Sequence, residues 1–321
     1  MHRTHTCGQL NGHHLGEKVT LAGWIANRRD HGGIAFIDLR DRYGITQLVF
    51  DPQAYPESAS TIESARAEWV IKIEGEVRPR PAGQENANLP TGSIEILVQT
   101  CTIVSKSKTP PFEVNDHGNI NEDIRLKYRY LDLRRDIQRK KIEFRAKVNN
   151  YTRKWFGEKG FLEVQTPIFT VSSPEGARDY LVPSRLHPGK FYALPQAPQQ
   201  YKQLLMVAGV DKYFQIAPCF RDEDPRADRH SCEFYQIDCE MSFVHQEDVL
   251  EVAENFAKEL VTDLCPERKL LTPSFKRLTH LEAMEKYGSD KPDIRFDCHF
   301  EDFSSTFEKS DFSVFKGAVE K

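Results

Sequence analysis

The sequence lacks the features of a membrane-bound or secreted protein. No apolar run approaches the roughly 20 residues that a membrane-spanning helix needs, and the segment from Met1 to Thr6 contains no apolar signal region. Glycine and proline, with 18 residues each among 321, are too few for a collagen-like or low-complexity chain. We therefore expect a globular protein of the cytoplasm that has no membrane partner.

Short cysteine spacings are also missing. None of the seven cysteines forms a C-x-x-C pair, their number is odd, and a chain of this length does not depend on disulfides for its stability. We expect reduced and mostly buried thiols. The alternative is a zinc site formed by Cys232 and Cys239 with His230 or His245, which lacks the tight ligand spacing of structural zinc sites.

The chain has no overall excess of positive charge. It carries 44 basic and 48 acidic residues, a net charge of −4, so its composition does not indicate nucleic-acid binding. Basic residues are nevertheless concentrated in residues 106–160, which hold 15 basic and 8 acidic side chains. This surplus favours contact with the phosphates of a polyanion, which cations attract regardless of sequence. The same pattern is also typical of a solvated helix face.

Residues 19–104 show the pattern of a small β-barrel. Apolar residues alternate in several segments, for example at Ile94, Ile96 and Val98, as they do in half-buried strands. Three such segments precede a predicted helix, Ala54–Glu68, and two follow it, which is the order of elements in an OB-fold. A generic small barrel is the alternative. The predicted strands are Val19–Arg28, Ile34–Arg40, Ile45–Asp51, Trp69–Val77 and Ser93–Val104.

The second half of the sequence predicts an α+β domain. Lys106–Pro111, with two prolines, indicates a linker, and a helix with an apolar stripe at Phe144, Val148, Tyr151 and Trp155 follows it. The later strands lack the β-α-β alternation of a parallel sheet, so we expect an antiparallel sheet. The predicted strands are Phe191–Leu194, Tyr213–Phe220 and Glu233–Phe243, and the predicted helices are Pro198–Ala208 and Gln246–Asp263.

The common nucleotide-binding and hydrolase motifs are missing. The sequence contains no G-x-x-x-x-G-K-S/T, G-x-G-x-x-G, G-x-S-x-G or H-E-x-x-H. Instead, Phe220–Asp224 and Glu233–Asp238 flank a loop rich in Arg, Asp and Glu. A charged hairpin tip is one explanation, but charges also lie within the strands, where burial without a partner is costly. Arg221 there suits a phosphate or carboxylate, which its planar guanidinium binds with two hydrogen bonds.

These residues, together with several longer segments, resemble the bacterial type of aspartyl-tRNA synthetase, a class II aminoacyl-tRNA synthetase, over essentially the whole chain. Residues 220–224 with 233–238 are similar to class II motif 2, and Lys159–Pro167 is similar to motif 1. Motif 3, Gly-φ-Gly-φ-Asp/Glu-Arg with φ an apolar residue, does not follow residue 243, so we expect a fragment of a longer synthetase. Pro174–Arg185, Leu194–Met206 and Tyr287–Asp293 resemble the loop that covers the substrate, the amino-acid pocket and the start of the inserted domain.

The resemblance implies a multi-domain fold. An all-β OB-fold barrel would be followed by an incomplete α+β class II domain with an antiparallel sheet and by the start of an inserted domain. Pro167 of motif 1 would lie at a homodimer interface. The implied boundaries are 1–105 for the anticodon-binding domain, 106–134 for a linker or hinge, 135–285 for the catalytic domain with motifs 1 and 2, and 286–321 for the start of the insertion domain.

The resemblance also implies an activity. An aspartate–tRNA ligase uses ATP and Mg²⁺ to convert L-aspartate to aspartyl-adenylate and then transfers the aspartyl group to tRNA(Asp), with tRNA(Asn) as a further candidate. The alternatives are a non-catalytic tRNA-binding fragment and an asparagine–tRNA or lysine–tRNA ligase. Magnesium ligands are expected mostly near motif 3, and no metal ligand is assigned within this chain. The implied ATP-binding residues are Arg221, Asp222, Glu223, His230 and Phe234, and the implied aspartate-binding residues are Glu175, Gln199, Lys202, Arg221 and Asp238.

Within these sets the resemblance implies separate roles. Arg221 would be catalytic, because it would bridge the α-phosphate and the aspartate carboxylate and stabilise the charge of the displacement. Phe234 would stack on adenine, and Asp238 with Glu175 would hold the substrate ammonium. Lys202 would pair with the side-chain carboxylate, which distinguishes aspartate from asparagine because an amide leaves a buried cation unpaired. The loop of motif 2 is one residue longer than usual, so His230 is a candidate only by position.

In the barrel, residues 24–41 resemble the anticodon-binding face of the family. Phe36 would stack on a base, a contact worth roughly 1–3 kcal/mol; the alternative is an aromatic residue of the barrel core. His31 and Gly83 lie in loops that vary within the family, and a histidine at the first of these positions is associated with relaxed discrimination between tRNA(Asp) and tRNA(Asn). The implied readers of base edges are Arg29, Gln47 and Glu95.

Overall fold

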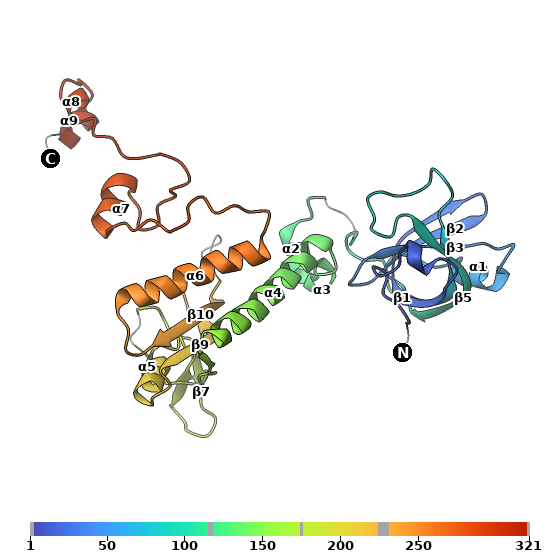
Figure 1. Cartoon of the computed structure of the whole chain (residues 1–321), viewed down its shortest axis with the longest axis horizontal. Helices are drawn as coiled ribbons and strands as arrows, with labels where there is room; N and C mark the ends of the chain where they lie inside the picture. The colour runs from blue at the N-terminus through green and yellow to red at the C-terminus, as the bar shows by residue number, and fades with distance from the viewer. Residues whose placement is uncertain (1–2, 115–117, 174–175, 224–230, 320–321) are drawn as a thin grey trace. The chain divides into compact units, whose positions relative to one another are not determined.

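The chain divides into two compact units, Met1–Phe144 (unit 1) and Arg145–Lys321 (unit 2), drawn as a cartoon in Figure 1. The division falls within helix α4 (Asp136–Glu158), whereas the sequence places the start of the second domain at residue 135. No helix within the described ranges is long and apolar enough to cross a membrane. The computed structural model describes residues 3–114, 118–173, 176–223 and 231–319.

Unit 1 contains a closed five-stranded barrel with strand order β1-β2-β3-β5-β4. The alternation of apolar residues forms the strands because every second side chain faces the interior of the barrel. All five predicted strands are confirmed, with ends shifted by at most three residues, and the order of elements is that of the predicted OB-fold. The elements are η1 (Gly12–His14), β1 (Lys18–His31), β2 (Ile34–Arg40), β3 (Ile45–Phe50), α1 (Pro56–Ile62), β4 (Val70–Pro79) and β5 (Ile94–Ser105).

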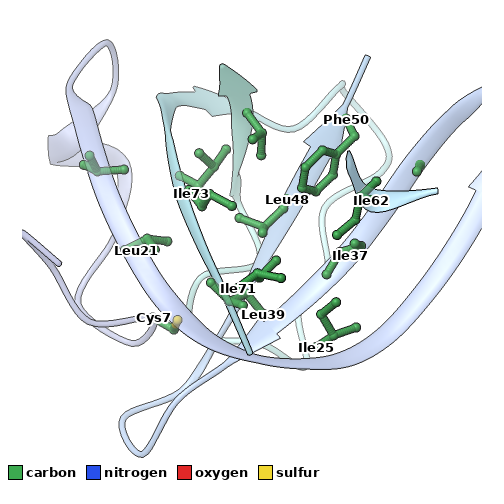
Figure 2. Close-up of a cluster of buried hydrophobic side chains, with 14 of the residues drawn as sticks. Cys7, Leu21, Ile25, Ile37, Leu39, Leu48, Phe50, Ile62, Ile71 and Ile73 are labelled. Carbon is green, nitrogen blue, oxygen red and sulfur yellow. The ribbon is translucent and has the colours of Figure 1, made fainter. Parts of the chain in front are cut away.

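The barrel interior is filled by aliphatic side chains. Figure 2 shows Leu21, Ile37, Leu48 and Ile71 converging there, and each is 0% exposed. Phe36, next to Ile37, is half-buried and does not belong to this cluster. The alternative that Phe36 is a core aromatic is therefore wrong. Its ring lies on the outer side of the barrel.

The helix of unit 1 is shorter than the prediction of Ala54–Glu68. It begins at Pro56 and ends at Ile62. Proline suits the first position of a helix, because a backbone N–H there has no acceptor within the helix. Glu68 has a positive φ of 65°, which no helix accommodates, and its backbone N–H donates to the carbonyl oxygen of Ile25 at 2.8 Å. Tertiary contacts of Glu68 thus override the local helical pattern.

Glu68 is the centre of a buried ion-pair network. Its carboxylate, 4% exposed, accepts hydrogen bonds from Arg40 Nη2 at 2.7 and 2.8 Å and from Arg134 Nη1 at 2.7 Å. The Arg134 guanidinium also lies over the Trp24 ring, 4.8 Å from its centroid. The network therefore ties the segment after the barrel to the barrel itself. Residues 106–134, expected as a linker, contain the short helices α2 (Glu122–Lys127) and α3 (Arg129–Asp132).

Unit 2 is built on a sheet with strand order β10-β9-β6. The two long strands pair antiparallel as predicted, but the short β6 joins β9 in parallel, so the sheet is mixed. The chain enters β6 directly from α4 through Gly160, whose φ of 82° turns the backbone sharply. The strands are β6 (Leu162–Glu163), β7 (Leu181–Pro183), β8 (Phe191–Ala193), β9 (Lys212–Phe220) and β10 (Glu233–Met241), and the helices are α5 (Gln199–Val207), α6 (Gln246–Leu264), α7 (His280–Tyr287), α8 (Ser304–Phe307) and α9 (Ser313–Val319).

Aromatic residues form the core of unit 2. Phe156 of α4 stacks on Phe214 of β9 with ring centroids 4.9 Å apart, and Phe256 of α6 packs against both α4 and this core. The apolar stripe predicted for α4 is buried only at its C-terminal end. Trp155 is 5% exposed and belongs to the core cluster with Phe161 and Phe214, whereas Phe144 is 43% exposed.

Cysteine reactivity tests this fold. All seven cysteines are free, as predicted, but only Cys7 and Cys219 are fully buried and Cys298 is exposed, so the prediction of mostly buried thiols was wrong. Burial raises the pKa of the Cys7 thiol and raises that of Cys101 to about 12, so both have little reactive thiolate near pH 8. We expect iodoacetamide to alkylate Cys298 first and Cys7 last, as followed by mass spectrometry of tryptic peptides. Labelling of Cys7 at the rate of Cys298 would contradict the barrel core.

Candidate functional site

Lys202 and Asp238 form the centre of a charged site in unit 2. Lys202 extends from α5, and its Nζ donates to Asp238 Oδ1 at 2.8 Å and lies 3.3 Å from Glu240 Oε2. Asp238 and Glu240 share one face of β10 because they are two residues apart. Burial lowers the pKa of Lys202, but its hydrogen bonds and attraction to the two carboxylates outweigh burial and raise it. Lys202 is therefore a fixed cation.

The second carboxylate oxygen of Asp238 is available to a ligand. Oδ2 is buried and accepts no hydrogen bond among the described residues. The Tyr213 hydroxyl, which donates to Gln215 Oε1 at 2.7 Å, is its neighbour: burial and the charge of Asp238 raise the pKa of Tyr213. A buried acceptor without a donor is costly, so such an atom is expected to receive one from a bound molecule. An ammonium group fits this position, because it donates hydrogen bonds and carries the opposite charge.

Arg221 and Phe234 lie at the other end of the same two strands. The backbone N–H of Arg221 donates to the Cys232 carbonyl oxygen at 2.8 Å, and its guanidinium lies 5.1 Å from the Phe234 ring centroid. Arg221 Nε is buried without a hydrogen-bond partner among the described residues. Asp222 and Glu223, which follow, are exposed. A guanidinium with an unused donor beside an aromatic face suits a phosphate with an adjoining base.

The structure also shows Gln199 and Pro167, two further residues predicted to function in unit 2. Gln199 is half-buried at the first residue of α5. Pro167 is exposed in an apolar stretch with Phe169, which is 60% exposed. Glu175 and His230 lie outside the described residues.

The sequence interpretation missed the role of Gln196. This side chain is 1% exposed and forms two hydrogen bonds with the backbone of Ala177, one donated at 3.0 Å and one accepted at 3.1 Å. Its Nε2 also donates to Asp179, so one buried amide holds the segment expected to cover the substrate. Gln196 stands in the stretch predicted to form the amino-acid pocket, but no local pattern distinguishes a glutamine that pairs with a distant backbone.

A second polar cluster lies on the barrel surface of unit 1 and unites three of the predicted base readers. Arg29 Nη2 donates to Gln47 Oε1 at 3.2 Å, and Gln47 Nε2 donates to Glu95 Oε2 at 2.8 Å. Phe36 is the direct cross-strand partner of Arg29 in the β1–β2 pairing, so its half-buried ring flanks the cluster. The structure therefore brings together all four residues predicted for base recognition.

Three charged residues of this cluster were not predicted. Asp38, 9% exposed, accepts from Arg29 at 2.8 Å, and Arg78 Nε donates to Glu95 Oε1 at 2.8 Å. Arg80 is 8% exposed, and its Nη2 has no hydrogen-bond partner in the described ranges. Burial lowers the pKa of Arg80, while the charges of Glu95 and Asp38 oppose this effect. The signal was available, because Arg78 of β4 and Arg80, which directly follows the strand, are two residues apart and extended backbone places such residues on the same face.

His31 and Gly83 lie at exposed positions of the same unit. His31 ends β1, and Gly83 has a φ of 83° in the loop between β4 and β5. A side chain at position 83 would be strained, because the backbone is in the left-handed region. No contact of either residue with the polar cluster is found in the described part of unit 1.

A closed OB-type barrel, followed by an α+β unit with a mixed sheet, is an arrangement of class II aminoacyl-tRNA synthetases. Two family models match the sequence: an OB-fold nucleic acid binding domain over residues 19–104, and tRNA synthetases class II (D, K and N) over residues 121–314. The second match covers more than half of the chain. The chain therefore belongs to the class II tRNA synthetases of the D, K and N group.

Curated relatives and solved structures agree with this assignment. The chain is 53% identical over 99% of its length to an aspartate–tRNA(Asp/Asn) ligase of Rubrobacter xylanophilus and 54% identical over 99% to that of Parvibaculum lavamentivorans. It covers 53% and 52% of these proteins, so it spans about half the length of the curated relatives it matches.

The fold is also found in solved structures. One is an asparaginyl-tRNA synthetase of Pyrococcus horikoshii complexed with asparaginyl-adenylate (TM-score 0.75, 23% identity, 89% of this chain and 69% of that chain). Another is that of Entamoeba histolytica, also with asparaginyl-adenylate (TM-score 0.71, 21% identity, 89% and 68%). At these identities the likeness shows the fold alone.

Proposed function

We propose that this chain is part of a cytoplasmic aspartate–tRNA ligase, which activates L-aspartate with ATP and transfers it to tRNA(Asp). The observation that carries the proposal is the pairing of a fixed cation, Lys202, with a carboxylate, Asp238, whose second oxygen accepts no hydrogen bond among the described residues. L-aspartate carries the complementary ammonium and carboxylate groups. The names of relatives at about 53% identity support the same substrate.

Different residues of the site would bind the ammonium and the side-chain carboxylate of aspartate. Asp238 Oδ2 would accept from the substrate ammonium, with Glu175 as a second acceptor. Lys202 would pair with the side-chain carboxylate of the substrate, and Gln199 at the start of α5 would complete the pocket. Asparagine would replace the charge-assisted contact between the substrate carboxylate and Lys202 with a weaker hydrogen bond from a neutral amide, which disfavours its binding.

The arginine end of the site would bind ATP. Arg221 would bridge the α-phosphate and the substrate carboxylate and stabilise the negative charge that develops in the displacement of pyrophosphate. Phe234 would stack on adenine, and Asp222, Glu223 and His230 would contact the nucleotide around it. Magnesium, when bound, would neutralise the outer phosphates; we assign no ligand for it in this chain.

The barrel cluster would bind the anticodon of the tRNA. Phe36 offers a half-buried ring for stacking, and Arg29, Gln47 and Glu95 next to it are hydrogen-bonded to one another, so a base would exchange one of these bonds for its own. The buried Arg80, whose Nη2 lacks a partner among the described groups, would add a further donor. The domain boundaries 1–105, 106–134, 135–285 and 286–321 belong to this proposal.

Replacing Phe36 with alanine tests the anticodon proposal. We expect the Kd for a tRNA(Asp) transcript to rise about 5- to 150-fold, because a stacked base contributes roughly 1–3 kcal/mol. Filter binding at fixed salt measures the effect, since phosphate contacts make affinity salt-dependent. Tyr43→Ala is the matched control, because Tyr43 is an exposed aromatic of the same barrel outside the cluster. An equal loss in both variants would refute a specific stacking role.

The choice of tRNA and the oligomeric state are open to direct tests. We propose tRNA(Asn) as a second acceptor because the relatives are named for both tRNAs and His31 stands at the variable loop. Failure to charge tRNA(Asn) under conditions that charge tRNA(Asp) would exclude it. We also propose a homodimer through the segment of Pro167 and the exposed Phe169, which sedimentation of wild type and Phe169→Asp would test.

The whole proposal is tested by aspartate-dependent ATP–pyrophosphate exchange. The assay is performed on this chain and on a fusion that continues it with the remaining half of the Rubrobacter xylanophilus ligase. Exchange in the fusion with aspartate, but not with asparagine or lysine, is the expected result. Exchange with another amino acid instead would replace the proposed substrate. Because the chain spans about half of its relatives, tRNA binding without exchange in both proteins would favour a non-catalytic tRNA-binding module.

A further inference from the structure

His5, His14 and Glu17 form a cluster of possible metal ligands ahead of the first barrel strand. Each offers one ligand atom, and the three atoms lie within 4.8 Å of one another. The two imidazole rings meet edge to face, with centroids 5.3 Å apart. We propose that these side chains bind one divalent transition-metal ion, with zinc as the reference case, through two imidazole nitrogens and one carboxylate oxygen. This set leaves a fourth, tetrahedral position for water.

The backbone around the cluster is held against the barrel. Beside His5, the N–H of Thr4 donates to the Thr20 carbonyl oxygen at 2.9 Å, and the N–H of Thr20 donates to Thr4 Oγ1 at 2.9 Å. Beside His14 and Glu17, the N–H of Val77 donates to the Glu17 carbonyl oxygen at 3.0 Å. The ligand positions are therefore fixed before any metal binds, which reduces the ordering cost of binding.

Two apolar side chains between the histidines also anchor this segment in the barrel core. Cys7 and Leu10 are 0% and 1% exposed, and Figure 2 shows Cys7 among the core side chains of the barrel. His5 and His14 thus stand on a loop whose apolar side is buried in the barrel. The buried side chains of Cys7 and Leu10 therefore hold the segment that carries both histidines in place.

The hydrogen bond of His5 is compatible with metal binding at its other nitrogen. Thr4 Oγ1 lies 3.0 Å from His5 Nδ1 and 3.3 Å from the Thr20 carbonyl oxygen. When the Thr4 hydroxyl donates to this carbonyl, His5 Nδ1 carries the imidazole proton and Nε2 offers its lone pair to a metal. An imidazole oriented by a hydrogen bond at its second nitrogen is the usual form of a metal-binding histidine.

His14 must exchange one hydrogen bond for the metal. Its Nδ1 accepts from the Asn11 N–H at 3.2 Å, which places the proton of the neutral ring on Nε2. Metal binding at Nε2 would move that proton to Nδ1 and break this bond. The turn keeps its cap, because Asn11 Oδ1 still accepts from the His13 N–H at 2.9 Å. We therefore expect micromolar rather than nanomolar affinity.

The ligand set selects the class of metal. Imidazole nitrogens with one carboxylate suit zinc, copper, nickel and ferrous iron, whereas magnesium and calcium prefer sites made of oxygen. Neither the charged site of unit 2 nor the polar cluster of the barrel shares a residue with this group. The inference is thus independent of the proposed function, and metal binding would add to the stability of unit 1.

Zinc titration of the whole 321-residue chain tests the proposal. We expect one zinc ion per chain by competition with a chromogenic chelator, and we expect zinc to raise the melting temperature of unit 1. His5→Ala and Glu17→Gln should each weaken binding by about tenfold or more. His13→Ala is the matched control, because His13 is an exposed neighbour outside the cluster. Circular dichroism verifies that the variants fold.

Three results would overturn the proposal. One is the absence of zinc binding up to millimolar concentration. Another is stoichiometric binding that persists unchanged in both His5→Ala and Glu17→Gln, which would place the metal on other groups such as the exposed Cys298. The last is an equal loss in His13→Ala. Cobalt supplies a separate readout, since a tetrahedral site with nitrogen and oxygen ligands gives visible absorption bands that should disappear in His5→Ala.

Discussion

Replacing Glu68 with alanine is expected to lower the free energy of unfolding of unit 1 by about 3–5 kcal/mol. The carboxylate is 4% exposed and accepts hydrogen bonds from Arg40 and Arg134. Arg40, itself 5% exposed, would lose two hydrogen bonds and the negative charge of Glu68 inside the barrel, and breaking a buried ion pair from one side costs far more than the intact pair contributes. Urea unfolding followed by tryptophan fluorescence measures the change, since Trp24 and Trp69 both lie in unit 1.

The control for this variant is Glu74→Ala. Glu74 is also on the barrel and pairs with Lys72 at 3.6 Å, but its side chain is 53% exposed. Exposed pairs contribute about 0–1 kcal/mol, so this variant should be almost neutral. If Glu68→Ala lost no more than Glu74→Ala, the network around Glu68 would have to be hydrated in solution, and the buried pairing would be wrong.

Replacing Arg221 with alanine is expected to reduce aspartate-dependent exchange in the fusion protein by about 100- to 1000-fold, the loss that follows removal of one preorganised group at a developing charge. Arg221 lies over Phe234, and its Nε is buried and unused among the described groups, so the side chain is held in place before substrate binds. Arg221→Lys should recover only part of the rate, because lysine keeps the charge but loses the planar pair of donors.

A comparison with Arg268→Ala makes the result specific. Arg268 is an arginine of the same unit with a 77% exposed side chain, and its removal should leave exchange unchanged. The loss in Arg221→Ala should appear in kcat as well as in KM for ATP, because the proposed contact strengthens as the displacement proceeds. Wild-type kcat in that variant would remove Arg221 from the chemical step.

The barrel could be predicted closely because its sequence repeats every two residues. Ile94, Ile96 and Val98 are 1%, 0% and 0% exposed, so the apolar positions of the pattern correspond directly to the interior. The helix before the fourth strand was predicted too long because Glu68 is fixed by contacts with Ile25 and Arg40, which come far earlier in the chain. Local patterns carry no information about such partners.

The candidate sites show the same limit. Phe36, Gln47 and Glu95 were identified through the resemblance to a family, and the structure places them together, but their roles remain predictions. Gln196 was missed because its function depends on the backbone of Ala177, on a separate segment. Arg80 could have been found from its spacing with Arg78, since strand periodicity places both on one face.

The closure of the barrel determines when unit 1 can fold. β3 and β5 pair in parallel at Leu48 with Ile96 and at Val49 with Leu97. The contact therefore joins residues that synthesis separates by about 50 positions, and contacts of such large sequence separation form slowly. During synthesis, the barrel therefore cannot close until β5 (Ile94–Ser105) has emerged from the ribosome. The apolar core of unit 1 is thus completed only after residue 105 has been synthesised.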